Sequence, residues 1–392
     1  MQLRPHQQKA LDALSKHNIG QCIFPTGAGK TLVGIMDAVK QFESEEQKTI
    51  VVVAPRILLA EQLSSEYLEH ITQAQVMHVH SGETHHFRTT KVSQIQWHDI
   101  LCKASNTHQL IFTTYHSLYK IQEAAIDVDT IYFDEAHNSV KRNFFPAVEH
   151  FSQEAGRKYY FTATPKHSAT IFKPGMNDHD VYGQVIAHVP ATQMVKEGYI
   201  LPPKVVVQKL DMVEDKKMIA ERDASNMLTT IDDNSLNKVL ICARSTKQIT
   251  KLVGESDFCQ QLHCRGYSWM YITSKTGAII DGTKVDREEF FETLNKWGKD
   301  PEKRFVVMHH SILAEGINVT GLEAVLFLRK MDYIGISQSI GRVIRLGGID
   351  KKFGMVCVPV YDKVGISTAK SVQAVVDTVF EKGEAAVSVI KR

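Results

Sequence analysis

Short apolar runs rich in β-branched residues recur along the first half of the chain, separated by segments with apolar positions at helical spacing. The runs lie at residues 20–24, 49–54, 110–113, 130–133 and 159–162. Helical patterns at 30–42 and 58–70 follow the first two of them. Strands that alternate with helices form βαβ units, in which helices cover both faces of a parallel sheet. The pattern therefore predicts an α/β fold.

The same rhythm returns in the second half, at residues 239–242, 269–272, 304–308, 324–327 and 354–360. Between the halves, Pro190, Pro202, Pro203 and a polar, helix-prone stretch interrupt it. We predict two tandem α/β lobes at 1–200 and 237–392, each a mainly parallel sheet with helices on both faces, joined by an interdomain connection at 201–236. Apolar residues at helical spacing from Ser367 to Ile390 predict a closing helix.

Composition supports two globular domains and excludes some classes of protein. A chain of 392 residues is long for one core, and 43% hydrophobic with 23% charged residues is typical of a folded protein. No apolar run approaches the roughly 20 residues of a membrane span, and no secretory leader is evident. Six cysteines without a disulfide framework favour a reducing interior. We expect no membrane contact and an intracellular location, either the cytoplasm of a bacterial or phage-infected cell or a nucleus.

A glycine-rich turn joins the first predicted strand to the first long helix. Its sequence is Phe24-Pro25-Thr26-Gly27-Ala28-Gly29-Lys30-Thr31. In this context the backbone N–H groups and the helix N-terminus face phosphates, Lys30 reaches the terminal phosphates and Thr31 offers its hydroxyl to Mg²⁺. Phe24 stands where the strict motif has glycine. A turn without function is the alternative, and the strand–turn–helix setting disfavours it.

Two carboxylates, Asp134 and Glu135, follow the predicted strand at 130–133. The carboxyl ends of parallel strands form the edge at which such sheets bind ligands. At that edge Asp134 would hold Mg²⁺, and Glu135 would orient or deprotonate the attacking water. Acidic pairs after strands are common, so the upstream glycine-rich turn is what favours the catalytic interpretation.

Three further segments complete an ordered series with these two. They are Phe161-Thr162-Ala163-Thr164-Pro165, Ala314-Glu315-Gly316-Ile317-Asn318 and Gln338-Ser339-Ile340-Gly341-Arg342-Val343-Ile344-Arg345. The series resembles the superfamily 2 DExH helicases, and most of all their compact DNA-directed members: type I and III restriction translocases, phage recombination helicases and repair helicases of the XPB kind. The resemblance implies two RecA-like lobes, ATP and Mg²⁺ as cofactors, and a role in DNA repair or recombination.

The resemblance also implies a partner and assigns roles to further residues. The implied partner is nucleic acid, DNA favoured over RNA, bound largely without sequence preference by a monomer or by a chain that partner proteins load. Residues expected at the nucleotide, besides the glycine-rich turn, are Arg4, Gln7, Gly316 and Asn318. Those expected at the nucleic-acid backbone are Pro55, Arg56, Gln62, Thr114, Ser245 and Thr273. Those expected to couple the two sites are His137, Thr162 and Thr164.

The last segment carries a candidate arginine finger. Gln338, Arg342 and Arg345 are spaced i, i+4 and i+7, which places them on one helical face. A guanidinium there suits the charge on a transferred phosphoryl group, and such a finger is worth about 10³–10⁵ in rate. We therefore expect ATP hydrolysis in a cleft between the lobes. A duplex translocase that does not separate strands, an RNA helicase and a catalytically idle sensor are the alternatives.

Other polar clusters are expected to be structural. His78, His80, His85 and His86 match no fixed metal-binding spacing, so we predict a polar loop after a strand and no structural zinc. His309 is expected to pack at a strand end. Arg157 either lines a nucleic-acid path or is a solvated charge.

Overall fold

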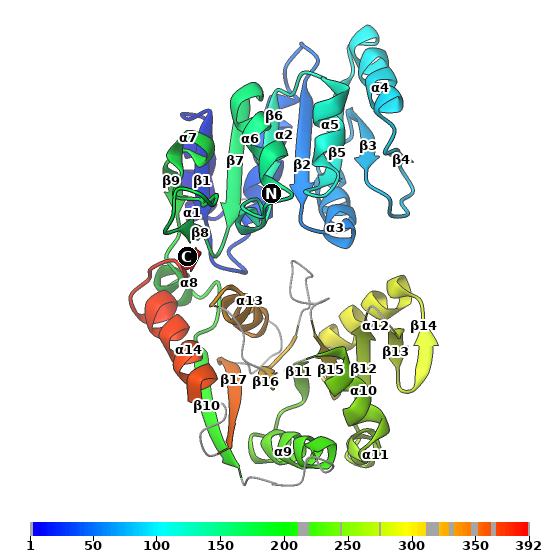
Figure 1. The fold of residues 1–392 in the computed structure, drawn as a ribbon, viewed down its shortest axis with the longest axis vertical. Helices are drawn as coiled ribbons and strands as arrows, with labels where there is room; N and C mark the ends of the chain where they lie inside the picture. The colour runs from blue at the N-terminus through cyan, green and yellow to red at the C-terminus, as the bar shows by residue number, and fades with distance from the viewer. Residues whose placement is uncertain are drawn as a thin grey trace. The chain divides into compact units, whose positions relative to one another are not determined.

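The protein consists of two compact α/β units. The computed structural model describes residues 3–210, 219–243, 245–273, 276–310, 321–328, 333–345, 352–361 and 366–390. The first unit runs to Pro190 and takes in the C-terminal segment from Val387, and the second comprises the described residues from Ala191 to Ala386 (Figure 1). Within the described ranges, every helix is too short or too polar to traverse a bilayer.

The first unit is built on an eight-stranded sheet in which all neighbouring strands run parallel. In sheet order the strands are β4 (Phe87–Arg88), β3 (Ala74–Val79), β5 (His108–Thr114), β2 (Thr49–Ala54), β6 (Thr130–Phe133), β7 (Arg157–Thr162), β1 (Ile19–Ile23) and β9 (Val185–His188). The helices are α1 (Pro5–Leu14), α2 (Lys30–Gln41), α3 (Ile57–Leu68), α4 (Val92–Ala104), α5 (Leu118–Ala124), α6 (Phe145–Glu154) and α7 (His179–Tyr182).

Helices cover both faces of this sheet, which explains the continuous apolar runs in its central strands. Every residue of β2 is buried. Val51 and Val53 belong to a core that includes side chains of α4, α5, α6 and α7. On the opposite face, the Tyr67 ring of α3 packs edge-on against Phe112 of β5, with 5.6 Å between ring centroids. A strand buried on both sides has no polar face, as is typical of parallel sheets.

The second unit contains a second eight-stranded sheet, parallel except at one edge. In sheet order its strands are β10 (Pro203–Leu210), β17 (Gly354–Tyr361), β16 (Ala324–Phe327), β11 (Lys238–Cys242), β15 (Phe305–His309), β12 (Ser268–Thr273), β13 (Gly277–Ile280) and β14 (Thr283–Val285). Strand β13 runs antiparallel to both β12 and β14. The helices are α8 (Ala191–Lys196), α9 (Ile219–Asp233), α10 (Thr246–Gly254), α11 (Phe258–Cys264), α12 (Arg287–Lys299), α13 (Tyr333–Val343) and α14 (Ile366–Val376).

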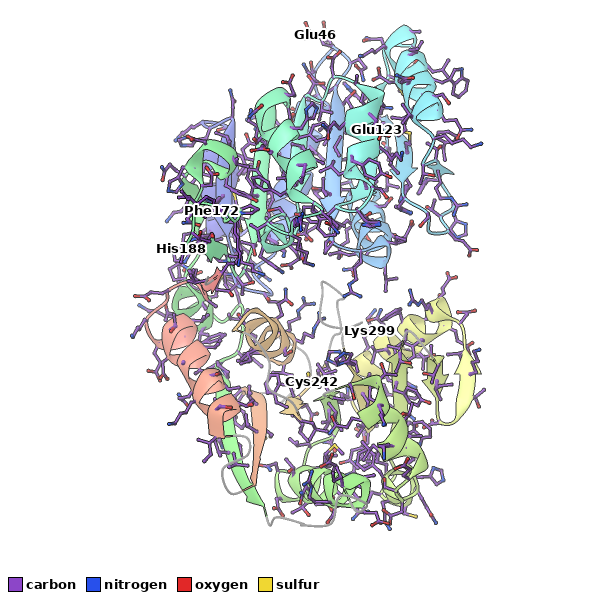
Figure 2. All side chains as sticks on the ribbon, in the orientation of Figure 1. Glu46, Glu123, Phe172, His188, Cys242 and Lys299 are labelled. Carbon is purple, nitrogen blue, oxygen red and sulfur yellow. The ribbon has the colours of Figure 1, made fainter. Side chains whose placement is uncertain are left out.

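This sheet is also covered on both faces. Side chains of α9, α10 and α11 share one core with Val239 and Ile241 of β11. On the other face Trp297 of α12 contacts the Phe305 ring of β15, with 5.7 Å between centroids. At the carboxyl edge Cys242 (Figure 2) ends β11 with its Sγ 3.2 Å from Nε2 of His309. His309 is buried, so the prediction that it packs at a strand end is confirmed.

Two segments differ from the sequence pattern. The stretch 201–236 was expected as a connection with a helix-prone part, where α9 lies, but it also contains β10, which pairs with β17 in the second sheet. The predicted closing helix is wrong at its end: α14 passes into a π-helical turn, η3 (Asp377–Glu381). The last described residues form β18 (Ser388–Ile390), which pairs with β8 (Lys166–Ser168) in the first unit. Gly383, with φ +73°, lies between helix and strand.

Candidate nucleotide-binding site

The glycine-rich turn lies between β1 and α2, as a phosphate-binding loop would. Gly27 and Gly29 have φ values of 89° and 76°, in the left-handed region that glycine adopts without strain. A Cβ on Gly29 would collide with the Gln7 side chain. No side chain caps the start of α2, so its first backbone N–H groups are not taken up by a capping residue. Such an uncapped helix N-terminus favours an anion.

Lys30 lies between the two carboxylates. Its Nζ is 3.2 Å from Oδ1 of Asp134 and also bonds to Oε1 of Glu135. Burial would lower the pKa of Lys30, but the charges and hydrogen bonds of both carboxylates outweigh burial and raise it. Burial in turn raises the pKa of Asp134 to about 6, although Lys30 opposes the shift. The three groups therefore form one electrostatic unit.

The backbone fixes the two carboxylates at the sheet edge. The N–H of Asp134 donates to the carbonyl oxygen of Val53 in β2 at 2.9 Å, which extends the sheet by one bond. The Tyr115 hydroxyl donates to the Asp134 carbonyl oxygen at 2.9 Å. Glu135 has φ 45° and ψ 52°, a left-handed conformation that costs a non-glycine residue about 1–2 kcal/mol. This turn aims the Glu135 side chain toward Lys30.

The N-terminal residues hold the glycine-rich turn. Gln7 Nε2 donates to the Gly29 carbonyl oxygen at 3.3 Å, and Gln7 Oε1 accepts the Arg4 backbone N–H at 2.9 Å. His6, which the sequence did not single out, has its Nε2 2.9 Å from the Ala28 carbonyl oxygen. Both His6 and Gln7 are buried. The structure thus brings Arg4 and Gln7, which were expected at the nucleotide, together with the loop expected at the phosphates.

His137 connects the acidic pair to the end of β7. Its Nδ1 lies 3.1 Å from the Thr162 hydroxyl, and 3.5 Å from each of the Thr164 hydroxyl and Glu135 Oε2. The Thr164 N–H donates to the Thr162 hydroxyl at 3.1 Å. The three residues expected to couple nucleotide and nucleic acid therefore form one buried hydrogen-bonded cluster.

The residues expected at nucleic acid in the first unit come from two neighbouring strand ends. Ala54 of β2 is in register with Thr114 of β5, so Pro55 and Thr114 lie at the same carboxyl edge. Arg56 precedes the first turn of α3 and is exposed. Gln62 lies on α3 and donates to Glu66 Oε1 at 2.7 Å.

The second unit holds the remaining candidates that the structure describes. Ser245 caps α10 by accepting the Gln248 N–H at 3.1 Å, and Thr273 ends β12. Gln338 and Arg342 lie one turn apart on α13, and both are buried. The expected helical face is wrong for Arg345, because α13 ends at Val343. Gly316 and Asn318 lie outside the described residues.

Arg157 takes neither of its two predicted roles. Its guanidinium donates to both carboxylate oxygens of Asp37 on α2, at 2.8 and 3.1 Å, and Asp37 is buried. The Tyr132 hydroxyl of β6 donates to the same carboxylate. The ion pair and the Tyr132 hydrogen bond together hold α2, the helix that follows the glycine-rich turn, against β7 and β6.

A glycine-rich turn, its lysine and two strand-end carboxylates on an all-parallel sheet define a P-loop unit of the RecA-like α/β class. The comparisons with known proteins agree. Residues 1–167 match the family model described as type III restriction enzyme, res subunit. This match bears out the resemblance to restriction enzymes over the residues that carry the turn and the acidic pair, and it ends before the second unit.

Solved structures confirm the fold of the whole chain. The Type ISP restriction-modification enzyme LlaBIII, bound to DNA, gives a TM-score of 0.74 at 19% identity over 100% of this chain. A nuclease-deletion mutant of the Type ISP enzyme LlaGI, in complex with a DNA substrate mimic, gives 0.69 at 22% identity over 99%. A fragment described as an HsdR subunit of a type I restriction enzyme from Vibrio vulnificus YJ016 gives 0.63 at 14% identity over 99%.

The chain corresponds to part of these proteins. It spans 31% of the LlaBIII chain, 30% of the LlaGI chain and 68% of the HsdR fragment. No curated protein sequence matches it. These relatives are restriction enzymes, and no comparison supports the expected role in repair or recombination.

Proposed function

We propose that the chain is an ATP-driven motor that translocates along DNA, of the kind that restriction enzymes use. The observation that carries the proposal is the contact of Lys30 with Asp134 and Glu135 at the carboxyl edge of a parallel sheet. The match of residues 1–167 to the restriction-enzyme family supports it independently. The DNA bound to LlaBIII and the DNA substrate mimic bound to LlaGI support DNA as the track.

The residues of the first unit fit a magnesium nucleotide. A carboxylate at the strand end and the Thr31 hydroxyl are hard oxygen donors, which Mg²⁺ prefers. When bound, MgATP supplies the γ-phosphoryl group together with the cation that neutralises it. Lys30 then exchanges its carboxylate contacts for phosphate oxygens. Asp134 is left to hold the cation, and Glu135 is left to accept a proton from the attacking water.

We further propose that Arg342 of the second unit completes the reaction centre, with Gln338 beside it. A planar guanidinium stabilises the charge that develops on the phosphoryl oxygens. If closure of the two units brings Arg342 to the nucleotide and ATP hydrolysis releases it, each cycle changes the separation of the nucleic-acid contacts on the two units. Backbone contacts at Arg56, Thr114 and Ser245 would make the motion along DNA independent of sequence.

The carboxylate role is tested by Glu135→Gln, which keeps the side chain's size. We expect MgATP binding to persist and DNA-stimulated hydrolysis to fall by at least about 100-fold, since positioned general bases contribute about 10²–10⁴. Glu43→Gln, an exposed change of the same kind, is the matched control. Hydrolysis near the wild-type rate in Glu135→Gln contradicts the assignment of the base.

The finger role is tested by Arg342→Ala. We expect nucleotide affinity within a few-fold of wild type and a fall in turnover of about 10³ or more. Because Arg342 is buried, the thermal unfolding of the Arg342→Ala protein is measured in parallel. Arg287→Ala, at an exposed position of α12, is the control. A folded Arg342→Ala protein that hydrolyses ATP normally excludes the finger.

The kind of motion is decided by two displacement assays run together. A duplex translocase removes a triplex-forming strand from duplex DNA and leaves a simple duplex intact, whereas a helicase separates the duplex. We expect triplex displacement alone. Stimulation of ATPase by RNA but not by duplex DNA would favour the RNA helicase alternative.

A further inference from the structure

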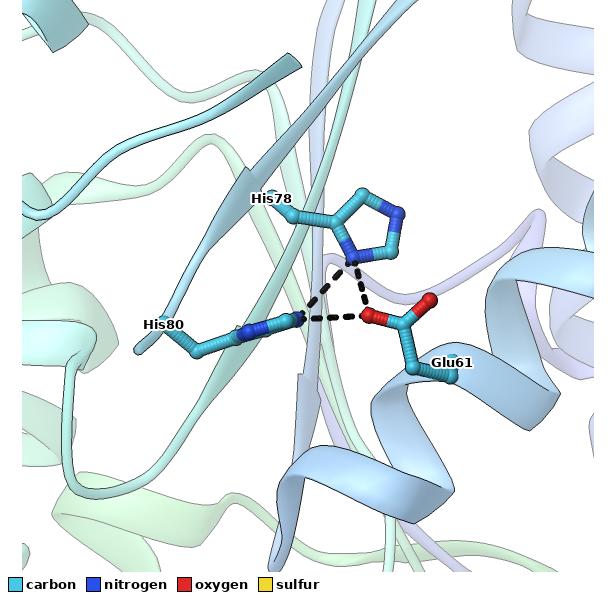
Figure 3. Close-up of side chains that lie close together, drawn as sticks. All are labelled: Glu61, His78 and His80. Carbon is cyan, nitrogen blue, oxygen red and sulfur yellow. Dashed lines mark hydrogen bonds and ion pairs between the residues drawn. The ribbon is translucent and has the colours of Figure 1, made fainter. Parts of the chain in front are cut away.

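A second cluster of ligand-type side chains lies in the first unit, away from the glycine-rich turn. It consists of Glu61 on α3, His78 in β3 and His80 just after β3 (Figure 3). Residues i and i+2 of a strand point to the same side, so both imidazoles face the helix that carries Glu61. The proposed motor function does not use this cluster, and the inference does not depend on that function.

The three ligand atoms form a nearly equilateral triangle. His78 Nδ1 and His80 Nε2 are 3.0 Å apart, and Glu61 Oε1 is 3.2 Å from the first and 3.1 Å from the second. Zinc bonds of about 2.0–2.1 Å in a tetrahedral site place neighbouring ligand atoms about 3.3–3.4 Å apart. The triangle is thus close to one face of a tetrahedron, with the fourth position left for water.

Hydrogen bonding alone does not satisfy the triangle. Two neutral imidazoles carry one proton each, so they bring two protons to three contacts at most. If both rings donate to Glu61, two N–H groups meet head to head at the 3.0 Å contact between His78 and His80. A cation that receives one lone pair from each atom satisfies all three contacts together.

The surroundings prepare the ligands for such a cation. Both rings are buried, and the Ser64 hydroxyl is 3.1 Å from Nε2 of His78, where it orients the ring. One contact opposes binding. The Gly82 N–H donates to Nδ1 of His80 at 3.2 Å. A cation on Nε2 moves the imidazole proton to Nδ1, where it faces the Gly82 N–H.

We propose that Glu61, His78 and His80 form a site for a divalent transition cation of the zinc class. Two imidazoles and one carboxylate are a donor set that suits zinc, cobalt or iron better than magnesium or calcium. The sequence favoured a polar loop and no zinc, but that prediction is wrong for the surroundings of His78 and His80, since both are buried. Of the four histidines in this segment, His85 and His86 are exposed.

The site joins α3 to the end of β3. Helix α3 begins directly after Pro55 and Arg56 and carries Gln62. A cation held by Glu61 in the middle of this helix fixes the helix on the sheet edge. Its role is therefore structural, in support of the segment that we expect to contact the DNA backbone.

The test is a titration of the full, untagged chain with Co²⁺ after treatment with a chelator. We expect one Co²⁺ per chain with the intense visible absorption of a four-coordinate site, displaced by one Zn²⁺. Glu61→Gln and His80→Gln should each weaken binding by at least about 100-fold. Ser64→Ala should weaken it by about 10–100-fold, as loss of a residue that orients a ligand does.

Matched variants separate this site from the other histidines and from the nucleotide site. His85→Ala removes an exposed neighbouring imidazole, and Asp134→Asn removes the carboxylate expected to hold Mg²⁺; both should bind Co²⁺ as the wild type does. Zn²⁺ should also raise the unfolding temperature of the wild type but not of Glu61→Gln, which is informative even if His80→Gln fails to fold. The absence of the absorption band, or equal binding by wild type and Glu61→Gln, overturns the proposal.

Discussion

Replacing Lys30 by Met tests whether the lysine and the two carboxylates act as one electrostatic unit. At 3.2 Å the Lys30–Asp134 attraction is about 5 kcal/mol at an effective dielectric constant near 20. The three side chains are only 10–16% exposed, so solvent screens them weakly. Breaking a buried pair by removing one partner costs about 3–5 kcal/mol. We expect the free energy of unfolding of the nucleotide-free variant to be lower than that of the wild type by about 3 kcal/mol at pH 8.

Calorimetry of nucleotide-free and magnesium-free protein measures this loss. For a unit of this size, about 3 kcal/mol corresponds to a decrease in Tm of about 6–12 °C. The decrease should shrink as the pH falls. Without Lys30, the pKa of Asp134 rises above its value of about 6, while the unfolded chain has an ordinary carboxyl pKa near 3.9. Between these values the folded state binds more protons, so its stability increases as the pH is lowered.

Lys40→Met is the matched control, because Lys40 lies on the same helix and is exposed. Its Tm should stay within about 1–2 °C of wild type, in line with about 0.5 kcal/mol for a surface substitution. The reasoning is refuted if Lys30→Met unfolds at the wild-type temperature at pH 8, or if its deficit is the same at pH 8 and pH 5.

Two further substitutions examine the turn and the coupling cluster. Thr162→Val removes the hydroxyl that bonds to His137; we expect basal ATPase within about twofold of wild type and no stimulation by DNA, so a variant that DNA stimulates normally would exclude the coupling role. Gly29→Ala places a side chain at a φ of 76°, which costs about 1–2 kcal/mol, and its Cβ would collide with Gln7. We therefore expect this variant to lose nucleotide binding in a fluorescent-nucleotide assay. Gly254→Ala is the control and should bind normally, because a Cβ there meets nothing within 4 Å.

Local sequence patterns predicted the parts of the structure that depend on neighbouring residues. Apolar runs identified the central strands, and the carboxyl edge of a parallel sheet brought the glycine-rich turn and the acidic pair together. The ion pair of Arg157 with Asp37 joins residues 120 positions apart, and no periodicity encodes such a partner. A three-residue strand such as β18 is too short for the pattern of apolar residues to distinguish it from a helix.

The histidine cluster was missed for a related reason. His78 and His80 share one face only if residue 78 lies in a strand, and Glu61 comes from a helix that precedes them. The prediction placed Gln338 and Arg345 on one helical face, which requires the helix to continue to residue 345, whereas α13 ends at Val343. In both cases the side chains were visible in the sequence, and their relative positions depended on element boundaries, which sequence patterns locate poorly.

The left-handed backbone of Glu135 sets backbone strain against a side-chain contact. For the backbone alone, glycine or asparagine would suit this position better, since both adopt positive φ at lower cost. Glu135→Gly would relieve about 1–2 kcal/mol of strain, but it would also break the buried contact with Lys30, which costs about 3–5 kcal/mol. The ion pair with Lys30 therefore holds Glu135 in a conformation that its backbone alone disfavours.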